Sequence, residues 1–140
     1  MKKKYFLVIL VLILTIFLSS CGGIVLPATD EAKIKSVING YFLDINNQDW
    51  SKAKSYCVYG SSSYNGLCET EAFVNDIYLH CNIITINAVI DIQNVSINDN
   101  YATVSIYVNT LITGCGEEYY AYERDGEFTL QKVGNSWKIY

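Results

Sequence analysis

Residues 84–92 read Ile-Thr-Ile-Asn-Ala-Val-Ile-Asp-Ile, and this stretch decides the fold class. Apolar and polar side chains alternate, with Val89 as the exception, which is typical of a β-strand with one buried face. The apolar phase shifts at Asn94, which predicts a bulge or bend. Asn98-Asp99-Asn100 has the composition of a turn, and alternation resumes from Ala102 to Ile112. The sequence therefore predicts a long antiparallel hairpin.

The strand pattern continues to the C-terminus. Residues 118–124 and 127–133 are strand-like, with an interruption or kink expected at Asp125-Gly126. Gly134-Asn135 suits a two-residue type II′ turn into residues 137–140.

That turn fixes the pairing of the last two strands. It places Lys132 opposite Trp137 and Leu130 opposite Ile139. We therefore expect one inner face formed by Leu130, Ile139, Phe128 and Trp137.

Helical patterns precede the strands. Thr29 is the expected N-cap of a first helix, whose apolar face is formed by Ile34, Val37, Ile38, Tyr41, Phe42 and Ile45. Asp49 is expected to cap a short second helix, and a third is expected from Thr70 to His80. Residues 58–67 are rich in Gly, Ser and Asn, so they are expected to form a loop.

Three helices followed by a bent antiparallel meander predict an α+β domain in which a curved sheet wraps the first helix. The runs from Ile34 to Asn47, from Asp49 to Ala53 and from Phe128 to Ile139 resemble the nuclear transport factor 2-like superfamily, specifically its small bacterial lipoprotein members. The resemblance covers residues 28–140 and implies a cone-shaped domain with N-terminal helices packed on the sheet. Its motifs are patterns of hydrophobicity and turns, so it predicts a fold and leaves the function open.

The start of the chain has the pattern of an export signal. Lys2, Lys3 and Lys4 precede an apolar stretch, residues 5–18, that is shorter than the roughly 20 residues needed to span a bilayer. Leu18-Ser19-Ser20-Cys21-Gly22 resembles the lipobox of bacterial lipoproteins, which implies that Cys21 is lipidated on sulfur and becomes the N-terminus. The alternatives are an ordinary signal peptide with a chance cysteine, or a short uncleaved anchor.

The expected organisation follows from this resemblance. Residues 1–20 are a lipoprotein signal peptide, residues 21–27 a lipidated tether, and residues 28–140 the folded domain. The domain would be held at the bacterial cell membrane or outer membrane, facing outside the cytoplasm.

Export makes the four remaining cysteines candidates for disulfides, because oxidising compartments permit them. Four cysteines allow three pairings, which the sequence does not decide. We favour Cys57 with Cys68, since that bridge would close the predicted loop, and Cys81 with Cys115 by elimination. The rival interpretation is a zinc site that includes His80, but no recognisable ligand spacing is present, so no metal or cofactor is predicted.

Charge argues against a nucleic-acid partner. Of ten Lys and Arg residues three lie in the leader, so seven face 14 acids in the mature chain. A protein that binds nucleic acid normally presents a basic surface.

Catalytic candidates are few, although the resembled superfamily includes enzymes similar to ketosteroid isomerase and scytalone dehydratase. His80 is expected near a helix C-terminus, and Asp44 and Asp91 are expected to be solvated surface charges. Acid–base chemistry would need a carboxylate or histidine with a perturbed pKa in a dry site. We therefore expect a non-catalytic binding or accessory domain.

The 12 tyrosines suggest what is bound. Tyr41, Trp50, Tyr120 and Tyr122 fall on faces predicted to point inward, so they could line a pocket for a small apolar ligand, or simply fill the core. Tyr101, Tyr107 and Tyr119 are predicted on the opposite sheet face, which would suit a protein partner or a homodimer through the sheet.

Overall fold

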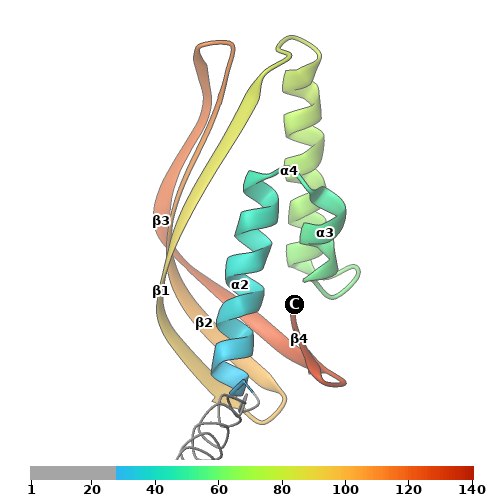
Figure 1. Ribbon diagram of the computed structural model, residues 1–140, viewed down its shortest axis with the longest axis vertical. Coiled ribbons are helices and arrows are strands. Elements are labelled where there is room, and N and C mark those ends of the chain that lie inside the picture. Colours follow the sequence, from blue (N-terminus) through green and yellow to red (C-terminus); the bar gives the residue numbers. More distant parts are fainter. Residues whose placement is uncertain (1–27) are drawn as a thin grey trace, which may run out of the picture.

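The computed structural model describes residues 28–140, which form three helices and a four-stranded sheet (Figure 1). The elements in chain order are α2 (Asp30–Asn46), α3 (Trp50–Ser55), α4 (Ser62–Tyr78), β1 (Ile84–Asn98), β2 (Tyr101–Gly114), β3 (Glu117–Val133) and β4 (Ser136–Ile139). Sequential strands pair antiparallel in the order β1-β2-β3-β4, and the long strands curve around α2. The predicted α+β class is confirmed. The expectations for residues 1–27, including lipidation of Cys21, lie outside the described residues.

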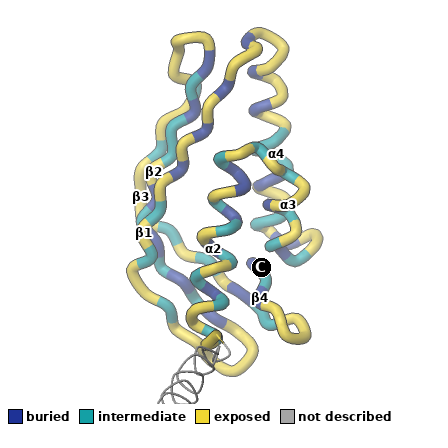
Figure 2. Tube along the Cα trace, viewed as in Figure 1, coloured by how far each residue is buried: buried dark blue, intermediate teal, exposed yellow. Residues whose placement is uncertain are grey.

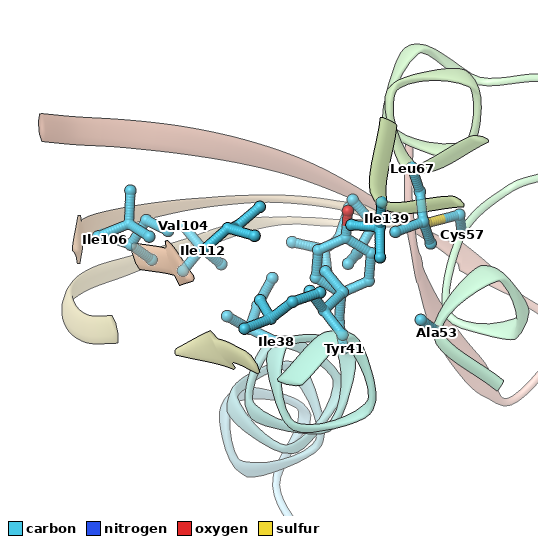
Figure 3. Packing of buried hydrophobic residues seen from close by; sticks show 14 of the residues in the cluster. Ile38, Tyr41, Ala53, Cys57, Leu67, Val104, Ile106, Ile112 and Ile139 are labelled. Atoms are coloured by element: carbon cyan, nitrogen blue, oxygen red, sulfur yellow. The ribbon is translucent and has the colours of Figure 1, made fainter. Parts of the chain in front are cut away.

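Helix α2 begins and packs as its sequence predicts. The Thr29 side chain accepts a hydrogen bond from the Ala32 N–H at 3.2 Å, which caps the helix. Ile34 and Ile38 on its apolar face are fully buried. Ile38 and Tyr41 project from α2 toward the sheet (Figure 3). The capping pattern and the apolar face therefore identify this helix in the sequence, and packing of that face on the sheet stabilises it.

Helix α4 corrects the sequence interpretation, because it begins at Ser62 rather than at Thr70. The Ser61 side chain accepts from the Tyr64 N–H at 3.2 Å, and Leu67 one turn later is buried. A cap and one core contact therefore outweigh the low helix propensity of Asn65 and Gly66. The expected loop over residues 58–67 is mostly helix.

The first hairpin confirms the alternation and its phase shift. Burial alternates along β1 and β2 (Figure 2), and the pairing register shifts between Ile92 and Asn94, at the expected bulge. The last hairpin also pairs as predicted, with Lys132 opposite Trp137 and Leu130 opposite Ile139. Gly134 has a φ of 60°, which the type II′ turn requires of its first central residue.

Strand β3 differs from the sequence interpretation near its start. It is continuous through Asp125-Gly126, where an interruption or a kink was expected, and its register shifts near Tyr119. That shift turns Tyr119 onto the core rather than the outer face. The Tyr119 ring fits there because Gly114 has no side chain: a Cβ on Gly114 would lie 3.2 Å from Tyr119 Cε2 and 2.9 Å from the Ile83 carbonyl oxygen.

Polar side chains at the end of α2 cover part of the free edge of β1. Asn46 Nδ2 donates to the Ala88 carbonyl at 2.9 Å, and the Ala88 N–H donates to Asn46 Oδ1 at 2.7 Å. Gln48 Nε2 donates to the Ile84 carbonyl at 3.0 Å. Exposed strand edges promote aggregation, and these amides satisfy edge groups as a further strand would.

The buried cluster extends from Ile34 to Ile139, so the described domain has its own core. Within residues 28–140, no helix has the length and apolar content needed to cross a membrane.

Candidate functional site

A cavity of about 760 Å³ lies between the concave face of the sheet and helices α2 and α4. Its floor consists of apolar side chains from β1 and β2: Ile86, Ala88, Ile106, Val108 and Ile112. Space remains because Ala88 and Gly126 contribute little volume to the floor and wall, and because α2 ends at Asn46. The cavity is therefore concave and mainly apolar, as small-molecule sites usually are.

Three aromatic rings meet in the cavity wall. Phe42 on α2 packs edge-on against Tyr41 and Phe128, with ring centroids 5.2 and 5.9 Å apart. Tyr41 and Phe128 are also in edge contact at 5.9 Å. These rings join α2 to β3, so this part of the wall is held by both elements.

Strand β3 contributes a second row to the wall, formed by Tyr120, Tyr122 and Arg124. These residues alternate along the strand and so share its inner face. The rings of Tyr120 and Tyr122 are stacked with centroids 6.0 Å apart, and Arg124 Cζ lies 4.5 Å from the Tyr122 ring centroid. Phe73 on α4 contacts Tyr120 at 6.4 Å, which links the row to the helix. The row is a stack of two aromatic rings with a cation at one end.

The polar groups of the cavity differ in their surroundings. Tyr122 Oη is buried and has no hydrogen-bond partner among the described residues. Burial also raises the pKa of the Tyr41 hydroxyl above its usual value, so Tyr41 stays neutral. Glu69, Arg124 and Glu127 also line the cavity, but these three residues are exposed at its opening.

Three of the four residues predicted for the pocket line this cavity: Tyr41, Tyr120 and Tyr122. The expectation for Trp50 was wrong, because the first residue of α3 packs beside the core and away from the cavity. Sequence reasoning missed Arg124, and it placed Phe128 on the inner face without assigning it to the pocket. Both share the alternation phase of Tyr120 and Tyr122, so the strand pattern could have identified them.

The three catalytic candidates lie away from the cavity. Asp44 was expected to be solvated, but it is only 2% exposed, and Lys52 Nζ donates to its Oδ1 at 3.0 Å. The expectation failed because α3 packs against the side of α2 that carries Asp44. The spacing of apolar residues along α2 does not reveal this contact. Asp91 is exposed as expected, and His80 is exposed just beyond the end of α4.

The cysteines follow one of the two favoured pairings. Cys81 and Cys115 form a disulfide, with Cα atoms 5.8 Å apart, and join the start of β1 to the β2–β3 turn. Cys57 and Cys68 are free thiols in the structure, so the predicted bridge between them is absent. The loop that it was meant to close is instead part of α4.

The described residues contain no group of three or more His, Cys, Asp or Glu side chains that could hold a metal ion.

Known structures share this architecture at low sequence identity. No protein-family model and no curated protein sequence matches the chain. A proposed dehydratase of the nuclear transport factor 2-like family from Streptomyces avermitilis superposes with a TM-score of 0.53 at 14% identity, over 81% of this chain and 93% of that one. The β subunit of benzoate 1,2-dioxygenase from Burkholderia mallei gives a TM-score of 0.57 at 14% identity, over 81% and 88%.

A third structure is similar to the same extent. A proposed aromatic ring hydroxylase from Novosphingobium aromaticivorans gives a TM-score of 0.56 at 12% identity, over 81% of this chain and 86% of that one. Likeness at such identities establishes a shared fold and leaves function open. The described domain has the nuclear transport factor 2-like fold.

Proposed function

We propose that this domain binds a small, mainly apolar molecule in the cavity between the sheet and helices α2 and α4. The observation that carries the proposal is the cavity itself, about 760 Å³ in volume with an apolar floor. Ligand sites usually measure roughly 300–1,000 Å³ and combine apolar walls with a few polar groups. Thr110 and Arg124, which line the cavity, supply such groups.

Binding is favoured over catalysis by the position of the carboxylates. Dehydratase-like chemistry, suggested by the name of one structural neighbour, would need an acid or base in a dry part of the site. Glu69 and Glu127 are the carboxylates that line the cavity, and both are exposed to water. The buried carboxylate, Asp44, is paired with Lys52 outside the cavity.

The same proposal places the domain on a membrane surface outside the cytoplasm, anchored through Cys21. Support comes from the lipobox resemblance of residues 18–22 and the short apolar stretch before it. The described chain starts at the end of α2 that lies farthest from the β2–β3 turn (Figure 1). An anchor there would leave the aromatic row of Tyr120 and Tyr122 directed away from the bilayer.

Dye binding tests the cavity. Because the buried cluster lies within residues 34–139, the segment 28–140 can be produced alone. N-phenyl-1-naphthylamine, a neutral apolar dye, should gain fluorescence on the folded domain, and Ala88→Phe should reduce this gain by filling the floor. Val89→Phe, on the outer face of the same strand, is the matched control. A folded domain that gives no fluorescence gain would contradict the proposal.

Lipid labelling tests the anchor. The full chain should incorporate a labelled fatty acid and fractionate with membranes, and Cys21→Ala should abolish the labelling and release or misprocess the protein. A mature N-terminus at any residue other than Cys21 would refute the proposed location.

A further inference from the structure

We propose that the unpaired edge of β3 binds an extended segment of a partner protein in which basic and apolar residues alternate. The segment would pair with residues 121–129 as a further strand of the sheet. This inference concerns the strand edge, so it does not depend on which molecule occupies the cavity.

The edge of β3 is open over most of its length. Strand β3 runs from Glu117 to Val133, but β4 pairs only with residues 130–133 of it (Figure 1). Next to these pairs, the Tyr140 N–H donates to the Thr129 carbonyl at 2.8 Å. Within the described domain, no backbone group bonds to residues 121–127 on that side of β3. The edge therefore presents a row of free hydrogen-bond donors and acceptors.

Two hydrogen bonds show which backbone groups face this edge. The Lys132 N–H donates to the Asn100 carbonyl on the β2 side at 2.8 Å, whereas the Thr129 carbonyl faces the β4 side. Backbone groups alternate in direction along a strand, and the pairing with β2 is continuous over residues 120–131. Every second residue before Thr129 therefore directs its N–H and C=O groups to the open edge. These residues are Ala121, Glu123, Asp125 and Glu127.

The open edge is accessible. The four residues that face it before Thr129 are all exposed, and Ala121 has almost no side chain to cover the backbone. The edge of β1 differs, because the amides of Asn46 and Gln48 bond to part of its backbone. Among residues 28–140, no side chain forms such bonds with residues 121–129 of β3. A partner strand can therefore reach these groups without displacing a residue of the domain.

Acidic side chains beside this edge select the partner. Glu123, Asp125 and Glu127 alternate along the outer face of β3, and none forms an ion pair within the described domain. A second copy of β3 would bring these carboxylates opposite one another, and opposed like charges destabilise paired strands. Lysine or arginine at alternate positions of a partner strand would lie beside the carboxylates and stabilise the pairing.

The inner face of the same strand is mainly apolar. Tyr120, Tyr122 and Phe128 alternate with the acidic residues, and Arg124 is the exception among them. Successive side chains of an extended segment point to opposite faces of a sheet. The apolar residues of the partner would therefore lie beside these rings while its basic residues lie beside the carboxylates. Pairing of this kind obtains affinity from the backbone and specificity from alternate side chains.

Synthetic peptides test the inference on the 28–140 domain by fluorescence anisotropy at low ionic strength. A peptide of alternating lysine and valine should bind, and a peptide of alternating glutamate and valine should not. Methylation of every backbone nitrogen of the first peptide keeps its charges but removes its N–H donors, so it should weaken binding about tenfold or more.

Two pairs of substitutions test the role of the carboxylates. Asp125→Asn with Glu127→Gln should weaken the lysine peptide about fivefold, as expected for the loss of two cross-strand charge pairs. Asp91→Asn with Asp99→Asn removes the same charge from β1 and the turn that follows it, and should have a smaller effect. Equal effects of the two pairs would show that net charge, rather than the β3 edge, attracts the peptide.

Amide hydrogen exchange locates the bound peptide. At saturation the N–H groups of Glu123, Asp125 and Glu127 should become protected, because they would then donate to the peptide. Equal binding of the methylated peptide, with no such protection, would overturn strand pairing. Protection of the same groups in a dimer without peptide would assign the edge to a second copy instead. Absence of lysine-peptide binding to a domain whose melting curve shows that it is folded would also refute the inference.

Discussion

The buried hydroxyl of Tyr122 should contribute nothing to stability. Removing its buried, unpartnered hydroxyl in Tyr122→Phe should leave the urea midpoint unchanged or raise it, because the folded state no longer buries an unsatisfied donor. Tyr107→Phe is the control, since the Tyr107 hydroxyl donates to Glu123 on the exposed outer face, and its loss should cost about 1 kcal/mol or less. A loss of more than 1 kcal/mol in Tyr122→Phe would show that the hydroxyl has an internal partner.

The two free cysteines should differ in reactivity. Cys57 is buried, and this burial raises the pKa of its thiol to about 11, whereas Cys68 on α4 is partly exposed. Because the thiolate is the reactive form, iodoacetamide at pH 8 should modify Cys68 in the folded protein well before Cys57. Peptide mass spectrometry would measure both rates.

The raised pKa of Cys57 also predicts a pH dependence of stability. The unfolded thiol ionises near its ordinary pKa of 9.0, so the contribution of the neutral buried thiol is complete below that pH. It is lost as the pH rises toward 11. Unfolding in urea without reductant should make both thiols reactive, and failure of both to react there would indicate the Cys57–Cys68 bridge that the structure lacks.

Individual residues also show where sequence reasoning ends. Three features were predictable because each depends on neighbours in the chain. They are the N-cap at Thr29, the turn at Gly134 and the pairing of Lys132 with Trp137. The burial of Asp44 and the position of Trp50 were not predictable, since their surroundings depend on how α3 packs against α2.

At the scale of elements, the end of α2 protects the edge of β1. Asn46→Ala removes two hydrogen bonds to Ala88, so it should lower the free energy of unfolding by about 1–2 kcal/mol. Asn47→Ala, at the exposed C-cap position, is the matched control and should have a smaller effect. Urea unfolding measures both.

Asn46→Asp distinguishes hydrogen bonding at the β1 edge from simple packing against it. If Asn46 only packed against the strand, Asn46→Asp would be tolerated almost as well as the native residue. Because Asn46 both donates and accepts, the carboxylate should fail to donate to the Ala88 carbonyl and should destabilise the domain. Equal stability of Asn46→Asp and the native protein would contradict edge pairing.

Elements were predictable where apolar periodicity was long and regular. The bulge after Ile92 appears in the sequence as a change of phase, and the structure confirms it. The register shift near Tyr119 has no such signal, because tyrosine is compatible with either sheet face. The start of α4 was missed for a related reason: Ser61 is a good cap, but Gly60 and the serines around it also suit a loop.

At the scale of the whole molecule, the curved sheet and the helices packed on it together leave a cavity that neither produces alone. Sequence patterns predicted which faces point inward, and therefore Tyr41, Tyr120 and Tyr122. They did not predict whether the interior is filled, because that depends on the volumes of side chains from five elements at once.

The most direct test of ligand binding in this cavity is a chemical-shift map of the 28–140 domain with N-phenyl-1-naphthylamine. Binding in the cavity should shift resonances of inner-face residues, such as Ile106, Tyr122 and Phe128, and leave the outer-face residues Asn109 and Tyr107 unchanged. Shifts confined to the outer face, or none at saturating dye, would contradict the account.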